Sequence, residues 1–346
     1  MRGEDAGMLR FEMNSTPAAL DVVGIGNAIV DVIAHADDAF LAQHAMEKGS
    51  MARIDEARAH AIYTVMESGI ESPGGSAGNT VAGIASLGGR AAYIGKVRDD
   101  ALGTAYRSGI TSAGIAFSTP CATEGPSTAR CLILVTPDAQ RTMNTYLGAC
   151  VNLMPEDIDA KLIESAQITY LEGYLFDPPH AQDAFRAASR IAHAAGRKVS
   201  LSLSDSFCVH RHRDAFLELL KHHVDILFAN EAEMRALFET DDLNAALESV
   251  RPLADVAAIT RGAAGSLVVF KEETIEVPAA PVARVVDTTG AGDLYAAGFL
   301  FGLTQGAPLA ECGRLASLAA AEIISHFGGR PETRLSEYVA TSSPAA

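Results

Sequence analysis

The sequence is poor in positive charge. Its 346 residues include 27 Lys and Arg against 43 Asp and Glu, which gives a formal net charge of −16. General binding to nucleic acid or to an anionic membrane needs clustered Lys and Arg, so an acidic surface disfavours both. An anionic small molecule stays possible, because a few local cations suffice to bind it. We therefore expect a small-molecule substrate, with no nucleic-acid and no membrane partner.

Cysteines and long apolar runs are also scarce. The five cysteines are odd in number, widely spaced and without a CxxC motif, which predicts a reduced, cytoplasmic protein. No uninterrupted apolar run reaches about 18 residues, so no membrane span is expected. The first twenty residues mix charged and polar side chains without an apolar block. We predict a flexible extension over 1–20 rather than a signal peptide.

Apolar runs and helical patterns alternate along the rest of the chain. Hydrophobic residues make up 48% of the sequence, enough for a large core. Runs typical of buried strands occur at 21–26, 91–95, 130–135, 168–173, 198–203, 224–230 and 256–260. Helical patterns occur at 54–67, 180–195, 212–222, 231–238, 292–304 and 308–326. This alternation predicts an α/β fold with a mostly parallel sheet.

Two regions fit the alternation poorly. The ranges of about 34–53 and 115–150 contain shorter alternating stretches and turn residues. We predict that they form a small β-rich subdomain over the sheet of a folded unit spanning 21–335. The last residues, 336–346, are predicted to be a tail.

Three widespread motifs fail on inspection. The nearest approach to a P-loop, at 88–97, has a spacing that is too long and places Val97 where a metal-binding hydroxyl is needed. A Rossmann fingerprint would need a third glycine where Ile29 stands. Residues 74–78 match GxSxG, but the preceding MESGIESP is not a buried strand. A serine hydrolase acting through Ser76 stays open as a distant alternative.

The stretch VVDTTGAGDLYAAGFL, residues 285–300, joins a glycine-rich turn to a helix. Gly290, Ala291 and Gly292 are small enough for their backbone N–H groups to approach an anion at the start of the helix. Asp293, the next residue, could accept a proton from a substrate hydroxyl during phosphoryl transfer. It could equally be an N-terminal capping acid. These residues alone leave both readings open.

Several segments together resemble the PfkB/ribokinase-like kinases. VDTTGAGDLYAAGFL resembles the C-terminal signature of that family, and residues 74–103, GGSAGNTVAGIASLGGRAAYIGKVRDDALG, resemble its N-terminal signature. ANEAE (229–233) is similar to its NxxE element, and TRGAAGS (260–266) to its nucleotide-side glycine turn. These elements stand in family order between about residues 21 and 331. GNAIVD (26–31) and TPDAQRTMNTYLGA (136–149) are more similar to the bacterial adenosine kinase branch than to the sugar kinases.

The resemblance implies a fold and an activity. The fold would be a three-layer α/β/α sandwich with a mostly parallel central sheet and a small β-sheet lid. The activity would be phosphorylation of the adenosine 5′-hydroxyl by ATP with Mg²⁺, as in purine salvage, and a monovalent cation is a further candidate. A monomer is favoured over a homodimer. The open alternatives are a kinase for another nucleoside or a free sugar, such as inosine, guanosine, ribose or fructose, and a binding-only protein.

The resemblance also implies roles for individual residues at the site of transfer. Asp293 would be the catalytic base, Gly290, Ala291 and Gly292 would donate N–H groups to the transferring phosphoryl, and Arg141 would present a lid cation to the phosphates. Asn230 and Glu233 would organise Mg²⁺ through water. The nucleotide would be bordered by Asn230, Thr260, Gly262, Gly265 and Thr289. Glu233 could instead be a first-turn acid of a helix, and Arg141 a solvated loop charge.

The remaining implied roles concern the acceptor substrate. Asp31 would bind the ribose 2′- and 3′-hydroxyls through charge-assisted hydrogen bonds. The neighbours grouped with it are Asn27, Gly74, Gly75, Ser76 and Asn79. The purine would be flanked by Ile29, Met51, Tyr174 and Leu175. Asn79 could also be a helix N-cap, and Tyr174 and Leu175 could be plain core residues.

Overall fold

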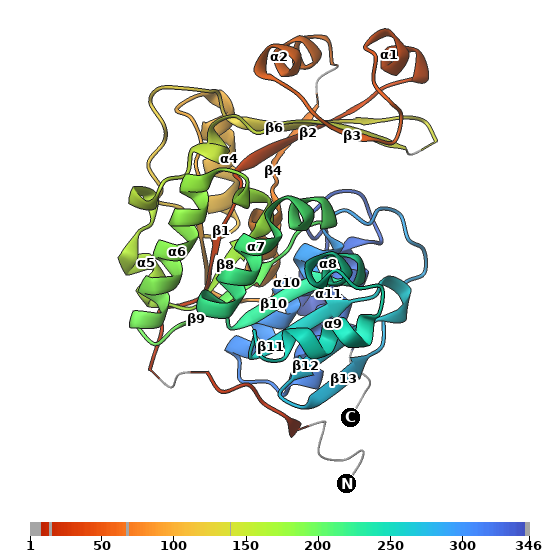
Figure 1. The fold of residues 1–346 in the computed structure, drawn as a ribbon. Helices are drawn as coiled ribbons and strands as arrows, with labels where there is room; N and C mark the ends of the chain where they lie inside the picture. Colours follow the sequence, from red (N-terminus) through yellow and green to blue (C-terminus); the bar gives the residue numbers. More distant parts are fainter. Residues whose placement is uncertain (1–7, 14–15, 67–68, 139, 343–346) are drawn as a thin grey trace.

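An eight-stranded sheet forms the centre of the protein (Figure 1). The computed structural model describes residues 8–13, 16–66, 69–138 and 140–342. The strands lie in the order β13-β12-β11-β10-β9-β8-β1-β5. Their bounds are β1 Leu20–Ile25, β5 Ala91–Ile94, β8 Ala166–Glu172, β9 Lys198–Ser202, β10 Ile226–Asn230, β11 Val256–Thr260, β12 Ser266–Phe270 and β13 Glu273–Val277. All pairings from β5 to β11 are parallel, whereas β12 and β13 are antiparallel to their neighbours. The predicted α/β fold is confirmed.

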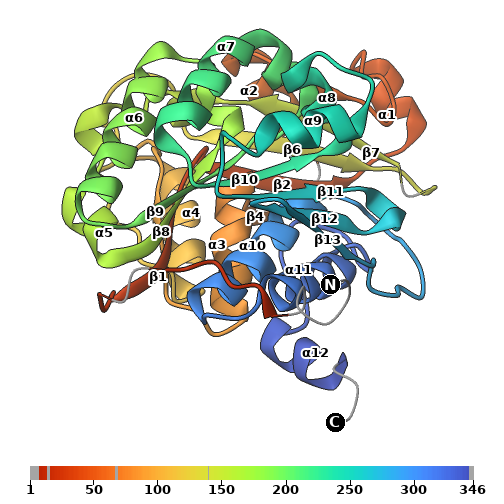
Figure 2. The same cartoon turned by 60° about the horizontal axis from the view of Figure 1, so that its bottom comes forward.

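Helices cover both faces of this sheet (Figure 2). Successive strand residues enter opposite cores: Val22 packs into one buried cluster and Val23 into the other. One face carries α3 Ser76–Ser86, α4 Ala101–Ser112, α10 Ala291–Thr304, α11 Leu309–Ile323 and α12 Leu335–Ser342. The other carries α5 Ala160–Ser165, α6 Pro179–Ala194, α7 Ser206–His223, α8 Glu231–Phe238 and α9 Leu243–Val250. Because both faces are buried, the inner strands read as continuous apolar runs.

The helices α3 and α10 pack closely through a glycine. A Cβ at Gly83 would lie 2.6 Å from Leu294 Cδ1 and 2.7 Å from Ala297 Cβ. Real Cβ atoms do not approach other atoms this closely, so the two helices are nearer than any larger residue at this position would permit.

A second, five-stranded sheet lies over one end of the main sheet. Its order is β3-β7-β6-β2-β4. The strands are β2 Ile29–His35, β3 Met51–Arg53, β4 Ile70–Pro73, β6 Ala129–Val135 and β7 Arg141–Tyr146, and α1 Asp38–Gln43 and α2 Glu56–Val65 lie on its outer side (Figure 1). The ranges predicted for a β-rich subdomain, 34–53 and 115–150, contain only part of it. The strand β4 was missed because it is short and exposed and ends in a proline.

The alternation along β2 decides what the second sheet offers to the space beneath it. Val30 and Val32 are buried, whereas Ile29 and Asp31 face the space between the two sheets. Asp31 is aligned with Cys131 of the parallel strand β6, so both lie on the same face. A carboxylate and a thiol therefore sit side by side on an otherwise largely apolar inner surface.

Both predicted termini are more ordered than expected where they are described. Phe11 is 8% exposed and packs edge-on against Phe270, and the N–H of Leu309 donates to the carbonyl of Leu9 at 2.8 Å. The predicted flexible extension is thus packed over 8–13. The predicted tail is helical through Ser342, because Leu335 at the start of α12 is fully buried. Within the described ranges, no helix has both the length and the apolar character that crossing a membrane requires.

Short 3₁₀ helices complete the connections. They span Gly148–Asn152, Pro155–Asp157, Gly173–Phe176 and Gly262–Ala264. The third follows β8 directly and the fourth follows β11, so both lie at the carboxyl edge of the main sheet. That edge is where open parallel sheets bind ligands.

Candidate active site

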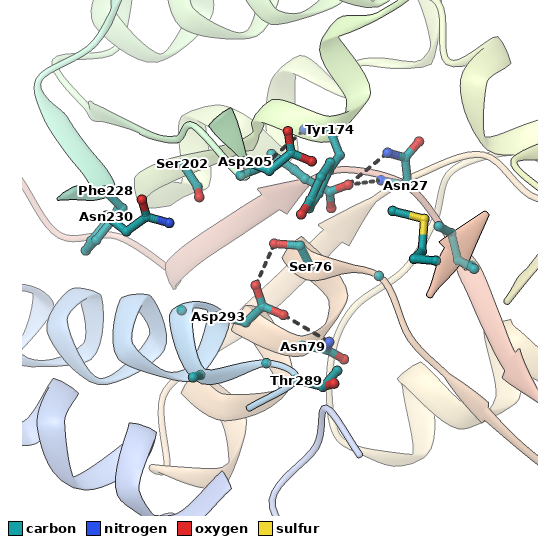
Figure 3. Close-up of a pocket in the computed structure, with 18 of the residues that line it drawn as sticks. Asn27, Ser76, Asn79, Tyr174, Ser202, Asp205, Phe228, Asn230, Thr289 and Asp293 are labelled. Atoms are coloured by element: carbon teal, nitrogen blue, oxygen red, sulfur yellow. Dashed lines mark hydrogen bonds between the residues drawn. The ribbon is translucent and has the colours of Figure 1, made fainter. Parts of the chain in front are cut away.

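A cavity of about 840 Å³ lies between the carboxyl edge of the main sheet and the inner face of the second sheet (Figure 3). Most residues singled out from the sequence line it, although they come from distant parts of the chain. They are Asn27, Ile29, Asp31, Met51, Gly75, Ser76, Asn79, Tyr174, Asn230, Glu233, Thr260, Thr289, Gly290, Ala291, Gly292 and Asp293. A volume of this size is typical of small-molecule sites.

Five of the proposed residues do not line the cavity: Arg141, which is described below, and Gly74, Leu175, Gly262 and Gly265. Leu175 is fully buried in the core beneath α6 and α7, so the prediction that it flanks a purine is wrong. Gly74 backs onto Asp31, where a Cβ would collide with the carboxylate. Gly262 and Gly265 have positive φ and shape the turn after β11, and a Cβ at Gly265 would strike the carbonyl of Val277.

The start of α10 is built from the glycine-rich turn. Gly290 is the N-cap, with φ 77°, a conformation that favours glycine. The N–H of Ala291 donates to the Thr288 carbonyl at 3.2 Å. The prediction that this N–H is free to bind an anion is therefore wrong. Among the described residues, no acceptor faces the N–H groups of Gly290 and Gly292. These two groups, at the positive end of the helix dipole, are the ones available to an anion.

Asp293 does not cap the helix that it begins. Its carboxylate accepts hydrogen bonds from Ser76 Oγ at 2.6 Å and from Asn79 Nδ2 at 3.1 Å, both on α3 (Figure 3). Burial raises the pKa of Asp293, and the two donors oppose that rise. The carboxylate is therefore fixed in orientation and is a better proton acceptor than a solvated aspartate.

Asp31 is an acceptor that the protein leaves unused. In the parts of the chain that are described, no donor hydrogen-bonds its carboxylate, and it faces the cavity. Burial raises its pKa to about 6, with Arg141 and Arg330 lowering it and Asp293 raising it further. A partly buried carboxylate with two free oxygens suits a ligand that brings a pair of hydroxyl donors.

Glu172, at the end of β8, was missed from the sequence. It is 1% exposed, and it accepts hydrogen bonds from Asn27 Nδ2 at 2.8 Å and from the N–H of Ala77 at 2.8 Å. Burial raises its pKa to about 7, while these donors lower it. Glu172 therefore fastens Asn27 to the start of α3. A carboxylate at the end of the apolar run ITYLEG was the available signal, because buried acids are rare unless they are paired.

Arg141 reaches the turn before α10 from the second sheet. It forms an ion pair with Asp287 and donates to Thr289 Oγ1 at 3.1 Å. Asp287 also accepts from the N–H of Thr289 at 3.0 Å and from the N–H of Gly328 at 3.1 Å. The side chain of Arg141 is only 10% exposed, so the solvated-loop alternative is wrong. Its guanidinium lies beside the anion site, and its charge is already balanced by Asp287.

Asn230 and Glu233 form a capping box at the start of α8. Asn230 Oδ1 accepts from the N–H of Glu233 at 2.9 Å, and Glu233 Oε2 accepts from the N–H of Asn230 at 3.0 Å. Burial raises the pKa of Glu233 to about 7, and the charge of Asp205 raises it further. Both oxygens of Glu233 are engaged, because Oε1 accepts from Asn230 Nδ2 at 2.6 Å.

These contacts fit a magnesium ion that keeps its waters. No group of three or more His, Cys, Asp or Glu side chains in the described ranges is arranged to hold a metal directly. Asp205 lines the cavity and uses one oxygen to cap α7, accepting from the N–H of Cys208 at 2.6 Å. Mg²⁺ bound mainly by phosphate oxygens and water would find Asn230, Glu233 and Asp205 as outer partners.

The inner face of the second sheet forms a largely apolar wall of the cavity. Alternate positions of its strands point inward, which adds lining residues that the sequence reasoning missed: Arg53, Cys131, Met143 and Thr145, with Leu147 directly after β7. Ile29 and Met51 belong to the same wall. Such a surface suits a flat heteroaromatic ring more than a hydroxylated one.

The hydrolase alternative finds no support in this geometry. The hydroxyl of Ser76 donates to Asp293, and no histidine among the described residues lines the cavity. The strand before it, β4, is an exposed edge of the second sheet rather than a buried strand of the main one. A nucleophile elbow needs both a base and that buried strand.

A doubly covered parallel sheet, free amides at the start of a helix and a carboxylate held beside them define a phosphotransferase that acts on an alcohol group. Residues 64–334, well over half of the chain, match the pfkB family carbohydrate kinase, and the chain belongs to that family. It is 51% identical to the adenosine kinase of Sinorhizobium meliloti, with a TM-score of 0.86, covering 94% of this chain and 100% of that one.

Other relatives carry different substrate names. A structure described as a probable sugar kinase from Rhizobium etli is 47% identical, with a TM-score of 0.86, covering 94% of this chain and 99% of that one. The adenosine kinase of Saccharomyces cerevisiae is 27% identical over 310 residues, 83% of this chain and 90% of the yeast protein. The protein is thus a PfkB-type nucleoside or sugar kinase with the ribokinase-like fold.

Proposed function

We propose that this enzyme transfers the γ-phosphoryl group of ATP to the 5′-hydroxyl of adenosine, giving AMP and ADP. One observation carries the proposal: Asp31, an acceptor that meets no donor among the described residues, shares a cavity with the base-like carboxylate of Asp293. A ribonucleoside supplies what each needs. Its vicinal diol brings two donors to Asp31, and its primary hydroxyl is available for deprotonation.

The chemistry follows from the positions of the side chains. The 5′-oxygen attacks the γ-phosphorus, the bond to the departing ADP oxygen breaks, and the hydroxyl proton moves to Asp293. The N–H groups of Gly290 and Gly292 donate to the transferring phosphoryl, and Arg141, paired with Asp287, holds the turn that carries these groups. Bound Mg²⁺ would neutralise phosphate charge, with Asn230 and Glu233 orienting its waters. Ser76 and Asn79 keep the accepting oxygens in place.

The apolar wall favours a nucleoside over a free sugar. A purine that packs on Ile29, Met51 and Met143 would remove their apolar surface from water. A free pentose or hexose would leave that apolar surface exposed to water. Tyr174 lines the cavity as well and is available to the same ring. A free-sugar kinase is the second candidate, because one close relative is described as a probable sugar kinase.

The deciding experiment is a substrate panel read by ADP release with ATP and Mg²⁺. Adenosine, inosine, guanosine, ribose and fructose are compared at matched concentrations by kcat/KM. We expect adenosine to exceed the sugars by at least about 100-fold, since a stacked purine adds several kcal/mol of binding. A preference for ribose or fructose would replace the nucleoside proposal with the sugar-kinase one. A variant carrying Asp293→Asn controls for contaminating activity.

Further features belong to the same proposal. Residues 21–335 would act as one catalytic unit, with the second sheet serving as a lid that excludes water during transfer. The enzyme would be a cytoplasmic monomer of the purine salvage route. Light scattering at working concentrations tests the oligomeric state, and activity with and without K⁺ tests a monovalent-cation requirement.

A further inference from the structure

Arg330 is a half-buried cation whose guanidinium lies partly within the protein. It lies in the loop between α11 and α12, and its Nε and Nη2 atoms are buried with no acceptor among the described residues. A guanidinium removed from water without a partner is costly, so such an arrangement persists only where the charge itself is used.

The surroundings of Arg330 lead to the acceptor site. A Cβ at Gly78, in the first turn of α3, would lie 3.7 Å from Arg330 Nη2 and 3.0 Å from Tyr106 Oη. Tyr106 Oη donates to the carbonyl of Gly74 at 3.4 Å, and Gly74 packs directly on the carboxylate of Asp31. Arg330 thus lies beside the first turn of α3, next to the glycine turn that carries Gly74 and outside the cavity lining.

The charges around both groups can be named. Asp31 is faced by Arg141 from β7, Arg330 from the loop after α11, Asp293 from α10 and the Cys131 thiol from β6. Arg330 is faced by Tyr93 from β5, Tyr106 from α4 and Asp31. Arg141 is paired with Asp287, whereas Arg330 forms no ion pair with a carboxylate in the described ranges.

We infer that Arg330 is a positioning residue for acceptor binding: its charge keeps Asp31 ionised and ready to accept the two ribose hydroxyls. This inference rests on the proposed function, because it assigns Asp31 to a vicinal diol. Burial alone pushes Asp31 towards its neutral form, which would turn one of its acceptors into a donor. The charge of Arg330 lowers the pKa of Asp31, and because Arg330 does not line the cavity it does not compete for the hydroxyls.

The test is the pH dependence of KM in Arg330→Met and Arg330→Lys. Without the cation the pKa of Asp31 rises above about 6, so a larger fraction of the carboxyl is neutral at pH 7. We expect Arg330→Met to raise KM for the nucleoside about ten-fold at pH 7 and to move the acid limb of 1/KM upward by at least about half a pH unit. The KM for ATP should stay unchanged. Arg330→Lys, which keeps the charge, should recover most of the loss.

A substrate that lacks the diol gives the matched comparison. With a 2′,3′-dideoxynucleoside, Arg330→Met should change KM less than two-fold, and in an Asp31→Asn background it should add nothing further. Arg197→Met controls for the removal of a buried arginine: Arg197 is 8% exposed, donates to the carbonyl of Glu164 at 3.0 Å and lies outside the cavity. It should lower Tm without moving the acid limb.

The outcomes separate this inference from the proposed function. An unmoved acid limb, or an equal loss with the dideoxynucleoside, would assign Arg330 a purely structural role. If the wild type phosphorylates no nucleoside, the proposed function fails. The influence of Arg330 on Asp31 is then read directly, by titrating the ¹³C-labelled Asp31 carboxyl in wild type and in Arg330→Lys and Arg330→Met. A higher pKa in Arg330→Met alone supports the inference, and identical titrations overturn it.

Discussion

Asp293→Asn tests the assignment of the catalytic base. The amide has nearly the same size as the carboxylate but cannot take up the hydroxyl proton. A positioned general base contributes about 10²–10⁴ in rate, so we expect kcat to fall at least about 100-fold, or roughly 2.7 kcal/mol in activation free energy. ADP release under saturating substrates measures this fall.

The surrounding hydrogen bonds set how much else should change. Ser76 Oγ, now 2.6 Å from Asp293 Oδ1, can still donate to the amide oxygen. Asn79 Nδ2, 3.1 Å from Oδ2, would instead face an NH₂ group and lose its acceptor. Loss of one such bond costs about 1 kcal/mol, so Tm and nucleoside affinity by calorimetry should change little.

The comparison variant is Ser76→Ala, which removes a donor but leaves the carboxylate. It should keep kcat within about ten-fold of wild type, since one supporting hydrogen bond contributes about 1 kcal/mol. A kcat for Asp293→Asn within ten-fold of wild type would refute the general-base role. Abolition of activity by Ser76→Ala, with Asp293→Asn nearly normal, would reverse the two roles.

Three further predictions concern the same cavity. Gly290→Ala should lower Tm and weaken ATP binding. A φ of 77° costs a residue with a Cβ about 1–2 kcal/mol, and the new Cβ would lie 3.1 Å from the Cα of Gly329. Calorimetry and the KM for ATP measure the two effects. Glu233→Gln should raise the Mg²⁺ concentration needed for half-maximal rate while leaving the nucleoside KM within two-fold, as measured by Mg²⁺ titration. The pKa of Glu172 is raised from 4.5 to about 7, so its contribution to the free energy of unfolding is full below pH 4.5 and is lost as the pH rises through 7. Urea unfolding at pH 5 to 8 should therefore show that the free energy of unfolding declines less with pH in Glu172→Gln than in wild type.

Much of the fold was readable from local pattern. The inner strands are buried on both faces, so continuous apolar runs such as KVSLSL and VAAIT predict strands without knowledge of their neighbours in the sheet. The turn before Asp293 was also predicted from the sequence, because three small residues followed by an acid at a helix start are typical of an anion site. The strand β4 was not legible, since an exposed edge strand carries no apolar signature.

The parts of the site that escaped prediction depend on tertiary contacts. Cys131 and Met143 reach the cavity only because their strands align in one register, which no local pattern specifies. Glu172 and Arg330 act on groups that are distant in the chain; Asn27, for example, precedes Glu172 by 145 residues. Leu175 was misassigned because a residue next to Tyr174 on a short 3₁₀ helix points the other way, into the core.

The contact of α3 with α10 at Gly83 has a consequence for catalysis. The first turn of α3 carries the serine and asparagine that hold Asp293, and the first turn of α10 carries Asp293 itself. The position of Asp293 relative to Ser76 and Asn79 is thus fixed by two helices in direct contact, at Leu294 next to Asp293 and at Gly83 about two turns along α3, rather than by the loops that surround the ligand. A single methyl group added at Gly83 would push the two helices apart and shift Asp293 relative to Ser76 and Asn79, although it would leave the identity of every cavity residue unchanged.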